Sequence, residues 1–176
     1  MMRYSTAAAF RQALETRLLT SSRESGMPVV RLRKLVTFER LLARMLVVAP
    51  DGWMLKGGVA LEARLHTQSR MTFDLDISRG DSEVHATRDF LIAQDLDLND
   101  YFTFSIEGSG QINDEIGAVA SRYRASASLA GRVFERVSID VGFHEPLFSS
   151  PELLPASDML QFAGIESAPI PTIPVR

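Results

Sequence analysis

The sequence predicts a single domain of the α+β class. The class is α/β-like, because helices and strands are expected to form one unit. Three observations lead to this prediction. Apolar residues recur at helical spacing in two stretches before residue 50. Apolar and polar residues alternate in later stretches, as they do in half-buried strands. The length of 176 residues suits one well-formed hydrophobic core and is too short for two comfortable domains.

Composition excludes several classes of protein. The chain is 45% hydrophobic and 23% charged, which is ordinary for a globular protein and indicates neither disorder nor a membrane class. No apolar run approaches the roughly 18 residues that a membrane span needs, and the amphipathic N-terminus lacks the apolar core of a signal peptide. The absence of cysteine excludes disulfides and thiolate metal sites. We therefore expect a cytoplasmic protein that does not enter a membrane.

Residues 1–50 are expected to form a helical segment packed on the core. Ser5 or Thr6 can cap a first helix that runs to about Ser22. Pro28 suits the first turn of a second amphipathic helix that ends near Val48. A Pro-Asp-Gly turn then separates this segment from the core, expected over residues 51–147.

The core region is predicted to consist of strands and two helices. Periodicity and turn residues predict a short strand, a glycine turn that opens a helix, a second strand, a second helix, a strand ending at Gly108-Ser109-Gly110, and an antiparallel hairpin. In order, these elements are expected at 53–55, 59–65, 71–78, 83–94, 102–106, and 122–129 with 134–143. The tail over 148–176 is rich in proline, so it cannot be a regular helix throughout, and one short helical turn is expected over 158–162.

One stretch carries the most chemistry. Asp74 and Asp76 lie two apart in a predicted strand, so their carboxylates share the polar face about 7 Å apart along the chain. Paired acids of this kind are commonly bridged by Mg²⁺, which prefers oxygen ligands and substrate phosphates. Gly57 and Gly58 open a helical pattern just before, where backbone N–H groups can approach an anion. The stretch therefore predicts a site for a metal-bound polyphosphate.

Asp140 is the candidate third carboxylate. It lies in an apolar strand, where a carboxylate is costly unless a partner satisfies it. A metal ion would do so, and an ion pair with Arg122, Arg124 or Arg136 is the alternative.

Three acids near a glycine turn suit two-metal phosphoryl transfer. Attack of a hydroxyl on a nucleotide α-phosphate builds charge on the attacking oxygen and on the departing pyrophosphate, and two cations stabilise both. Lys56 and the amides of Gly57 and Gly58 are expected to hold the polyphosphate, and Arg70 is a further candidate phosphate contact. Residues 1–50 carry nine Arg and Lys against three Glu, while the remainder carries ten against nineteen acids. A basic flank beside an acidic pocket suits docking of a polyanion such as RNA, although a solvated arginine-rich helix explains it equally well.

The chain resembles the AbiEii-type nucleotidyltransferase toxins, a branch of the DNA polymerase β-like nucleotidyltransferase superfamily. The segments that carry the resemblance are LKGGVALEARL, RMTFDLDIS, YFTF and SLAGRVFERVSIDVGFHEP. It covers about residues 29–147, because RLRKLVTFERLLARM also fits the helix that precedes the first motif.

The resemblance implies a mixed, largely antiparallel sheet flanked by helices, the nucleotidyltransferase fold. It also implies Mg²⁺-dependent nucleotide transfer from an NTP, with Mn²⁺ as the alternative ion, and in several relatives a tRNA acceptor end and a cognate antitoxin. By position, Gly57 and Gly58 match the family glycines, Asp74 and Asp76 match the metal-binding pair, and Asp140 matches the third acid.

Two departures from the family pattern leave alternatives open. Val59 stands where relatives commonly have Thr or Ser. Relatives also continue into a helical C-terminal domain with an A-E-K segment, so the tail is expected to lead into a domain that this sequence does not include, and the active site to be incomplete without it. A noncatalytic nucleotide-binding or protein-interaction module of the same fold is therefore one alternative, and a phosphotransferase acting on a small metabolite is another.

Overall fold

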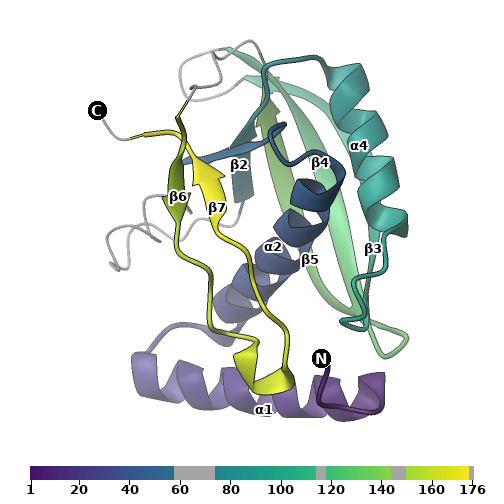
Figure 1. The fold of residues 1–176 in the computed structure, drawn as a ribbon, viewed down its shortest axis with the longest axis vertical. Helices are drawn as coiled ribbons and strands as arrows, with labels where there is room; N and C mark the ends of the chain where they lie inside the picture. The colour runs from purple at the N-terminus through teal and green to yellow at the C-terminus, as the bar shows by residue number, and fades with distance from the viewer. Residues whose placement is uncertain (58–73, 114–117, 144–149, 175–176) are drawn as a thin grey trace.

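Helices pack on a seven-stranded mixed sheet in the part of the chain that the computed structural model describes, residues 1–57, 74–113, 118–143 and 150–174 (Figure 1). The strand order is β3-β4-β5-β2-β1-β7-β6, with parallel pairing between β2 and β5 and between β1 and β7 and antiparallel pairing elsewhere. The predicted α+β class, with a mixed and largely antiparallel sheet, is confirmed. The helices are α1 (Ala7–Ser25), α2 (Val29–Val48) and α4 (Glu83–Asp95), with a 3₁₀ turn η1 (Gln161–Ala163). The strands are β1 (Met54–Lys56), β2 (Asp74–Ser78), β3 (Phe102–Asn113), β4 (Val119–Leu129), β5 (Arg132–Gly142), β6 (Glu152–Leu154) and β7 (Ile170–Thr172).

Local signals define the two N-terminal helices. The Thr6 hydroxyl accepts a hydrogen bond from the Ala9 amide at 3.1 Å and so caps α1. Gly26 ends α1 with a φ of 74°, a left-handed conformation that glycine adopts without steric cost, and its amide donates to the Ser22 carbonyl. The second helix follows Pro28 and ends at Val48, as predicted.

The core lies between one face of the sheet and the helices α2 and α4, which contact each other and pack on β5 and β3 respectively (Figure 1). Alternation along β4 shows the division, because Tyr123, Ala125 and Ala127 are buried while Arg124 between them is exposed. On β2, Leu75 and Ile77 are fully buried, and Asp74 and Asp76 project from the opposite face. The sheet therefore presents a polar face on the side away from α2 and α4.

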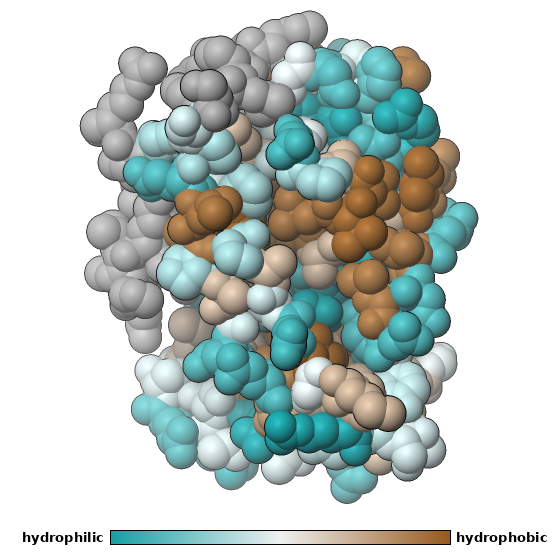
Figure 2. Space-filling model, viewed as in Figure 1, coloured by the Kyte–Doolittle hydropathy of each residue, from teal (hydrophilic) through white to brown (hydrophobic). Residues whose placement is uncertain are grey.

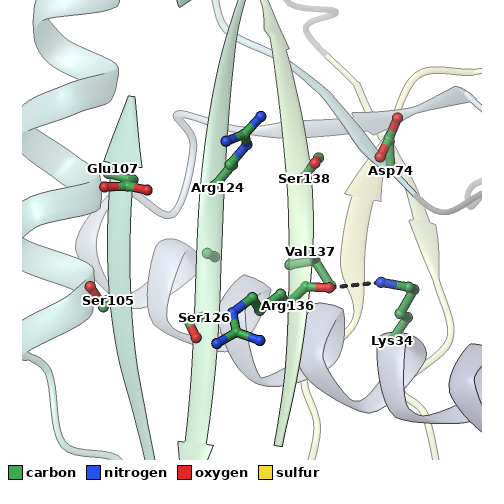
Figure 3. Close-up of a pocket in the computed structure, with 10 residues that line it drawn as sticks. Lys34, Asp74, Ser105, Glu107, Arg124, Ser126, Arg136, Val137 and Ser138 are labelled. Carbon is green, nitrogen blue, oxygen red and sulfur yellow. Dashed lines mark hydrogen bonds between the residues drawn. The ribbon is translucent and has the colours of Figure 1, made fainter. Parts of the chain in front are cut away.

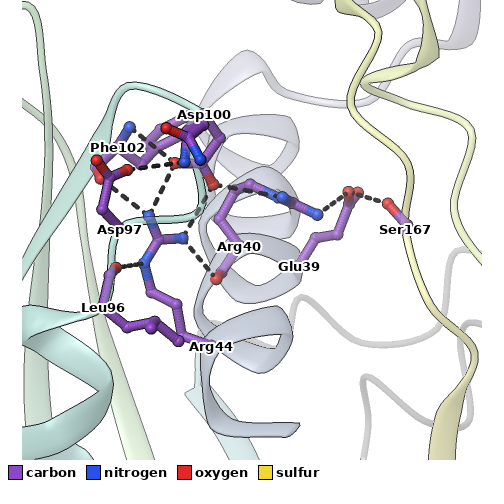
Figure 4. Close-up of polar contacts among 9 residues, drawn as sticks. Glu39, Arg40, Arg44, Leu96, Asp97, Asp100, Phe102 and Ser167 are labelled. Atoms are coloured by element: carbon purple, nitrogen blue, oxygen red, sulfur yellow. Dashed lines mark hydrogen bonds and ion pairs between the residues drawn. The ribbon is translucent and has the colours of Figure 1, made fainter. Parts of the chain in front are cut away.

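Buried polar contacts tie α2 to the loop that precedes β3 (Figure 4). Arg44 binds Asp100 through two hydrogen bonds of 2.8 and 3.0 Å, and Arg40 adds a third at 3.3 Å. Asp100 also accepts from the Phe102 amide at 3.1 Å. We call Arg40, Arg44 and Asp100 the buried arginine cluster. It satisfies charges that would otherwise be costly inside the core.

Apolar side chains also gather on the outer surface of α4 (Figure 2). Ala86, Phe90 and Ala93 face the core, while Val84, Leu91 and Ile92 are at least half exposed. None of the helices in the described ranges combines the length and apolar character that crossing a bilayer requires.

One prediction about a strand was wrong, and two short strands were not predicted. The strand expected to end at Gly108-Ser109-Gly110 continues as β3 to Asn113. Its pairing with β4 shifts between Gly108 and Gly110, and Gly110 has a φ of 111°, so the glycines accommodate a bulge without ending the strand. The tail, for which one short helical turn was predicted, also contributes β6 and β7, which were not predicted, and β7 pairs with β1.

Candidate active site

Parallel pairing of β2 with β5 brings the three predicted acids to neighbouring positions. Asp76 lies directly opposite Asp140 in the register, and Asp74 lies opposite Ser138. Adjacent strands are about 4.8 Å apart, and residues two apart on a strand share a face. Asp74, Asp76 and Asp140, which we call the acid cluster, therefore occupy adjoining positions on the polar face of the sheet.

Arg122 lies against this cluster from the neighbouring strand. It is opposite Asp140 in the pairing of β4 with β5. Its Nε and Nη2 atoms donate to the two Asp140 oxygens at 2.7 and 2.8 Å, and Nη2 lies 3.5 Å from an Asp74 oxygen. The hydrogen bond to Asp140 is the main cause that raises the pKa of Arg122 above its ordinary value. Of the three arginines considered as partners of Asp140, the structure selects Arg122.

Gly57 approaches the acid cluster from the other side. It follows β1, where Lys56 is opposite Asp76, so the Lys56 and Asp76 side chains project from the same face. Gly57 has a φ of 73°, and a Cβ added there would lie 2.9 Å from the Asp76 Cβ and closer still to a carboxylate oxygen. Only glycine fits this position. Gly58, Val59 and Arg70 lie outside the described residues.

A match to a known protein family identifies the family of this chain. The model of the nucleotidyl transferase AbiEii toxin family, of type IV toxin–antitoxin systems, matches residues 40–176. The chain belongs to the AbiEii family. Among curated proteins, no match to the chain was found. The match includes β1, the acid cluster, Arg122 and the tail, so the expected family is confirmed. The match begins at residue 40, later than the expected residue 29, and extends beyond residue 147.

The chemistry of the acid cluster in this AbiEii protein fits a divalent cation. Carboxylate oxygens are the donors that Mg²⁺ and Mn²⁺ prefer, and a cationic group, the Arg122 guanidinium, already lies among them. Within the described ranges, no three acidic or histidine side chains are already gathered as a metal site. Both Asp140 oxygens are instead engaged by Arg122.

Sequence reasoning missed Arg79, which holds the end of β2. Its side chain is almost fully buried and lies 4.0 Å above the Trp53 ring. It donates to Asp81 at 2.6 and 2.7 Å and to Asp89 at 2.8 Å. The hydrogen bond from Arg79 lowers the pKa of Asp81 below its ordinary value. The only signal in the sequence was an arginine directly after a strand and before a helix with acids on it.

A hollow of about 710 Å³ opens on the polar face next to Asp74 (Figure 3). We call it the polar groove. It runs from Asp74 on β2 across β5 and β4 to β3. Its lining consists of Lys34, Asp74, Ser105, Glu107, Arg124, Ala125, Ser126, Arg136, Val137 and Ser138. Serines and two exposed arginines dominate it, and it was not predicted from the sequence.

Proposed function

We propose that this AbiEii-family toxin is a metal-dependent nucleotidyltransferase that transfers a nucleotide from an NTP to tRNA. Membership of the family supports nucleotide transfer and a toxin role. The observation that carries the rest is the register of β2 and β5, which sets Asp76 opposite Asp140 with Asp74 on the same face. Gly57, which tolerates no side chain, borders the same acids.

Asp74, Asp76 and Asp140 are proposed to hold two Mg²⁺ ions, with Mn²⁺ as a substitute. Bound there, the ions would neutralise charge that develops on the attacking hydroxyl, the α-phosphate and the departing pyrophosphate. Lys56 and the amides at Gly57 and Gly58 are proposed to bind the polyphosphate, and Arg70 to add a phosphate contact. In the reaction a bond forms from the acceptor oxygen to the α-phosphorus, the bond to the bridging oxygen breaks, and the hydroxyl proton passes to water.

We further propose a cytoplasmic setting, where NTPs and tRNA are available, and restraint by a cognate antitoxin. Assignment to type IV toxin–antitoxin systems supports the antitoxin. The basic residues of the N-terminal helices are consistent with a polyanionic substrate.

A noncatalytic nucleotide-binding or protein-interaction module is the second candidate function. One observation favours it: Arg122 neutralises Asp140 and contacts Asp74, so part of the acid cluster is satisfied without a metal ion.

Labelling with α-³²P nucleotides tests the proposal. The protein is incubated with each NTP in turn, total tRNA and Mg²⁺, and labelled RNA is measured for the wild type and for Asp76→Asn. Label should enter tRNA with the wild type and fall to background with the variant, while circular dichroism shows that the variant is folded.

Other outcomes would identify the alternatives. Transfer of the γ-phosphate with release of a nucleoside diphosphate would identify a phosphotransferase. Thermal stabilisation by an NTP without transfer to any acceptor would favour the noncatalytic module.

A further inference from the structure

We propose that the polar groove binds the sugar–phosphate backbone of a single-stranded RNA acceptor and directs its end to the acid cluster. This inference rests on the proposed nucleotidyltransferase function and assigns the acceptor to one side of the site. The groove begins at Asp74, one of the acids proposed to hold the metal ions. It spans β2, β5, β4 and β3, which is about 14 Å at the usual strand spacing and enough for a few backbone phosphates.

Two arginines of the groove are available for phosphate. Arg124 and Arg136 are exposed on β4 and β5 and project on the same side as Asp74 (Figure 3). Among the described residues, neither side chain forms an ion pair or a hydrogen bond. Arg122, two residues along β4, is by contrast paired with Asp140 and Asp74. Unpaired guanidinium groups facing a hollow are suited to bidentate contact with phosphate.

The serines complete a surface suited to a nucleic-acid backbone. Ser105, Ser126 and Ser138 lie on three successive strands along the groove. Hydroxyl groups can donate to phosphate oxygens and can both donate to and accept from ribose hydroxyls. No aromatic side chain lines the groove in the part of the chain that the structure describes. Base stacking is therefore absent from the binding mode, and little sequence preference is expected.

The strand order separates the two substrates. The acid cluster lies on β2 and β5, in the middle of the sheet. Gly57 and Lys56 of β1 flank it on one side, and the polar groove over β5, β4 and β3 extends on the other. A polyphosphate bound beside Gly57 would leave the groove free. The acceptor can therefore reach the acids from the opposite side, as an in-line displacement requires.

The test combines binding and transfer. A short fluorescein-labelled single-stranded RNA is titrated by anisotropy at several salt concentrations with wild type, with the double variant Arg124→Gln and Arg136→Gln, and with Arg132→Gln. Arg132 is the matched control, because it is exposed at the start of β5, lies outside the lining of the groove and has no side-chain partner among the described residues. The double variant should bind RNA roughly tenfold more weakly. Its plot of log affinity against log salt should lose about 1.4 units of slope, about 0.7 for each lost phosphate contact. The control should match the wild type.

Steady-state transfer separates this inference from the proposed function. In the double variant the KM for RNA should rise by a similar factor, while kcat and the KM for the NTP stay near the wild-type values. Unchanged RNA binding and an unchanged KM, with transfer intact, would overturn the groove assignment and leave the proposed function standing. RNA binding that depends on the groove, without nucleotide transfer, would support the groove assignment and overturn the proposed function. Labelling of a protein acceptor with no RNA binding would overturn the groove assignment.

Discussion

The buried arginine cluster and the acid cluster with Arg122 use the same interaction in opposite surroundings. In the first, Arg44 and Asp100 are 0% and 1% exposed. In the second, Arg122 is 33% exposed, with Asp140 at 15% and Asp74 at 43%. Both are built on a bidentate contact between arginine and carboxylate. Removal of Arg44 or Asp100 would leave an unpaired charge buried in the core. Water can replace either partner of the more exposed pair of Arg122 with Asp140.

This contrast indicates which cluster can exchange its cation for another. In the buried arginine cluster the Arg44 guanidinium stays in place, because its departure would leave the Asp100 carboxylate buried without a partner or water. Another cation can replace the Arg122 guanidinium at Asp140 and Asp74 at a modest cost in free energy. We therefore expect changes in the buried cluster to affect stability, and changes in the acid cluster to affect activity and metal binding.

The largest expected effect follows from Asp140→Asn. Loss of the carboxylate removes a proposed metal ligand, and transfer should fall by roughly a thousandfold, comparable with the loss of a major transition-state contact. The midpoint of thermal unfolding should change little, because the site is partly exposed. Single-turnover kinetics measure the transfer rate, and a melting curve measures the midpoint of thermal unfolding. Asp51→Asn, in an exposed turn, is the control. Equal activity of the two variants would remove Asp140 from the mechanism.

Asp100→Ala should give the largest loss of stability. It leaves Arg44 and Arg40 without their shared carboxylate and removes the acceptor for the Phe102 amide. Breaking a buried pair in this way costs about 3–5 kcal/mol of unfolding free energy. Urea denaturation followed by circular dichroism measures the loss. A cost below about 1 kcal/mol would show that the buried cluster behaves like a surface pair and would end the contrast.

Arg122→Gln should raise the affinity for metal ions, because the guanidinium no longer competes for Asp140 and Asp74. A gain of roughly fivefold is expected, since a partly exposed pair is worth about 1 kcal/mol. Titration with Mn²⁺ alone, followed by electron paramagnetic resonance, measures it. Arg124→Gln is the matched control from the same face of β4. A loss of affinity specific to Arg122→Gln would show that the guanidinium organises the acids and does not compete for them.

The smallest expected effect is a pH-dependent loss of stability when Asp81 is changed. Asp81 is partly exposed, while its partner Arg79 is buried. The bond from Arg79 lowers the pKa of Asp81 in the folded state. The stabilisation is therefore present above the ordinary aspartate pKa of about 3.9 and is lost as pH falls through the lowered value. Asp81→Asn should melt a few degrees below the wild type at pH 7, and the gap should close in strong acid. A gap that is constant with pH would rule out the charge as its origin.

Local chemistry in the sequence was enough to predict several features. Thr6 and Gly26 bound the first helix through capping and a left-handed turn, which neighbouring residues dictate. Alternation around Asp74 and Asp76 gave the polar face correctly. The same reasoning offered Arg122 among three possible partners of Asp140, and it could go no further because the choice depends on how β4 pairs with β5.

The remaining features depend on contacts between distant segments. The register that sets Asp76 opposite Asp140 is fixed when two remote strands pack on a common core, and no local pattern encodes it. The three-residue strands β6 and β7 are too short to show alternation. Glycines at 108 and 110 looked like a strand end, since a bulge and a turn share the same residue signal. The polar groove, likewise, exists only once four strands lie side by side.

The parallel pairing of β1 with β7 has a consequence for how the protein is made. Leu55 is opposite Thr172, and the Ile173 amide donates to the Leu55 carbonyl at 3.1 Å. During translation the strand that leads into Gly57 leaves the ribosome long before its partner, so a nascent chain holds this strand at an unprotected edge. The edge of β1 is therefore covered only once the chain has been made as far as Ile173.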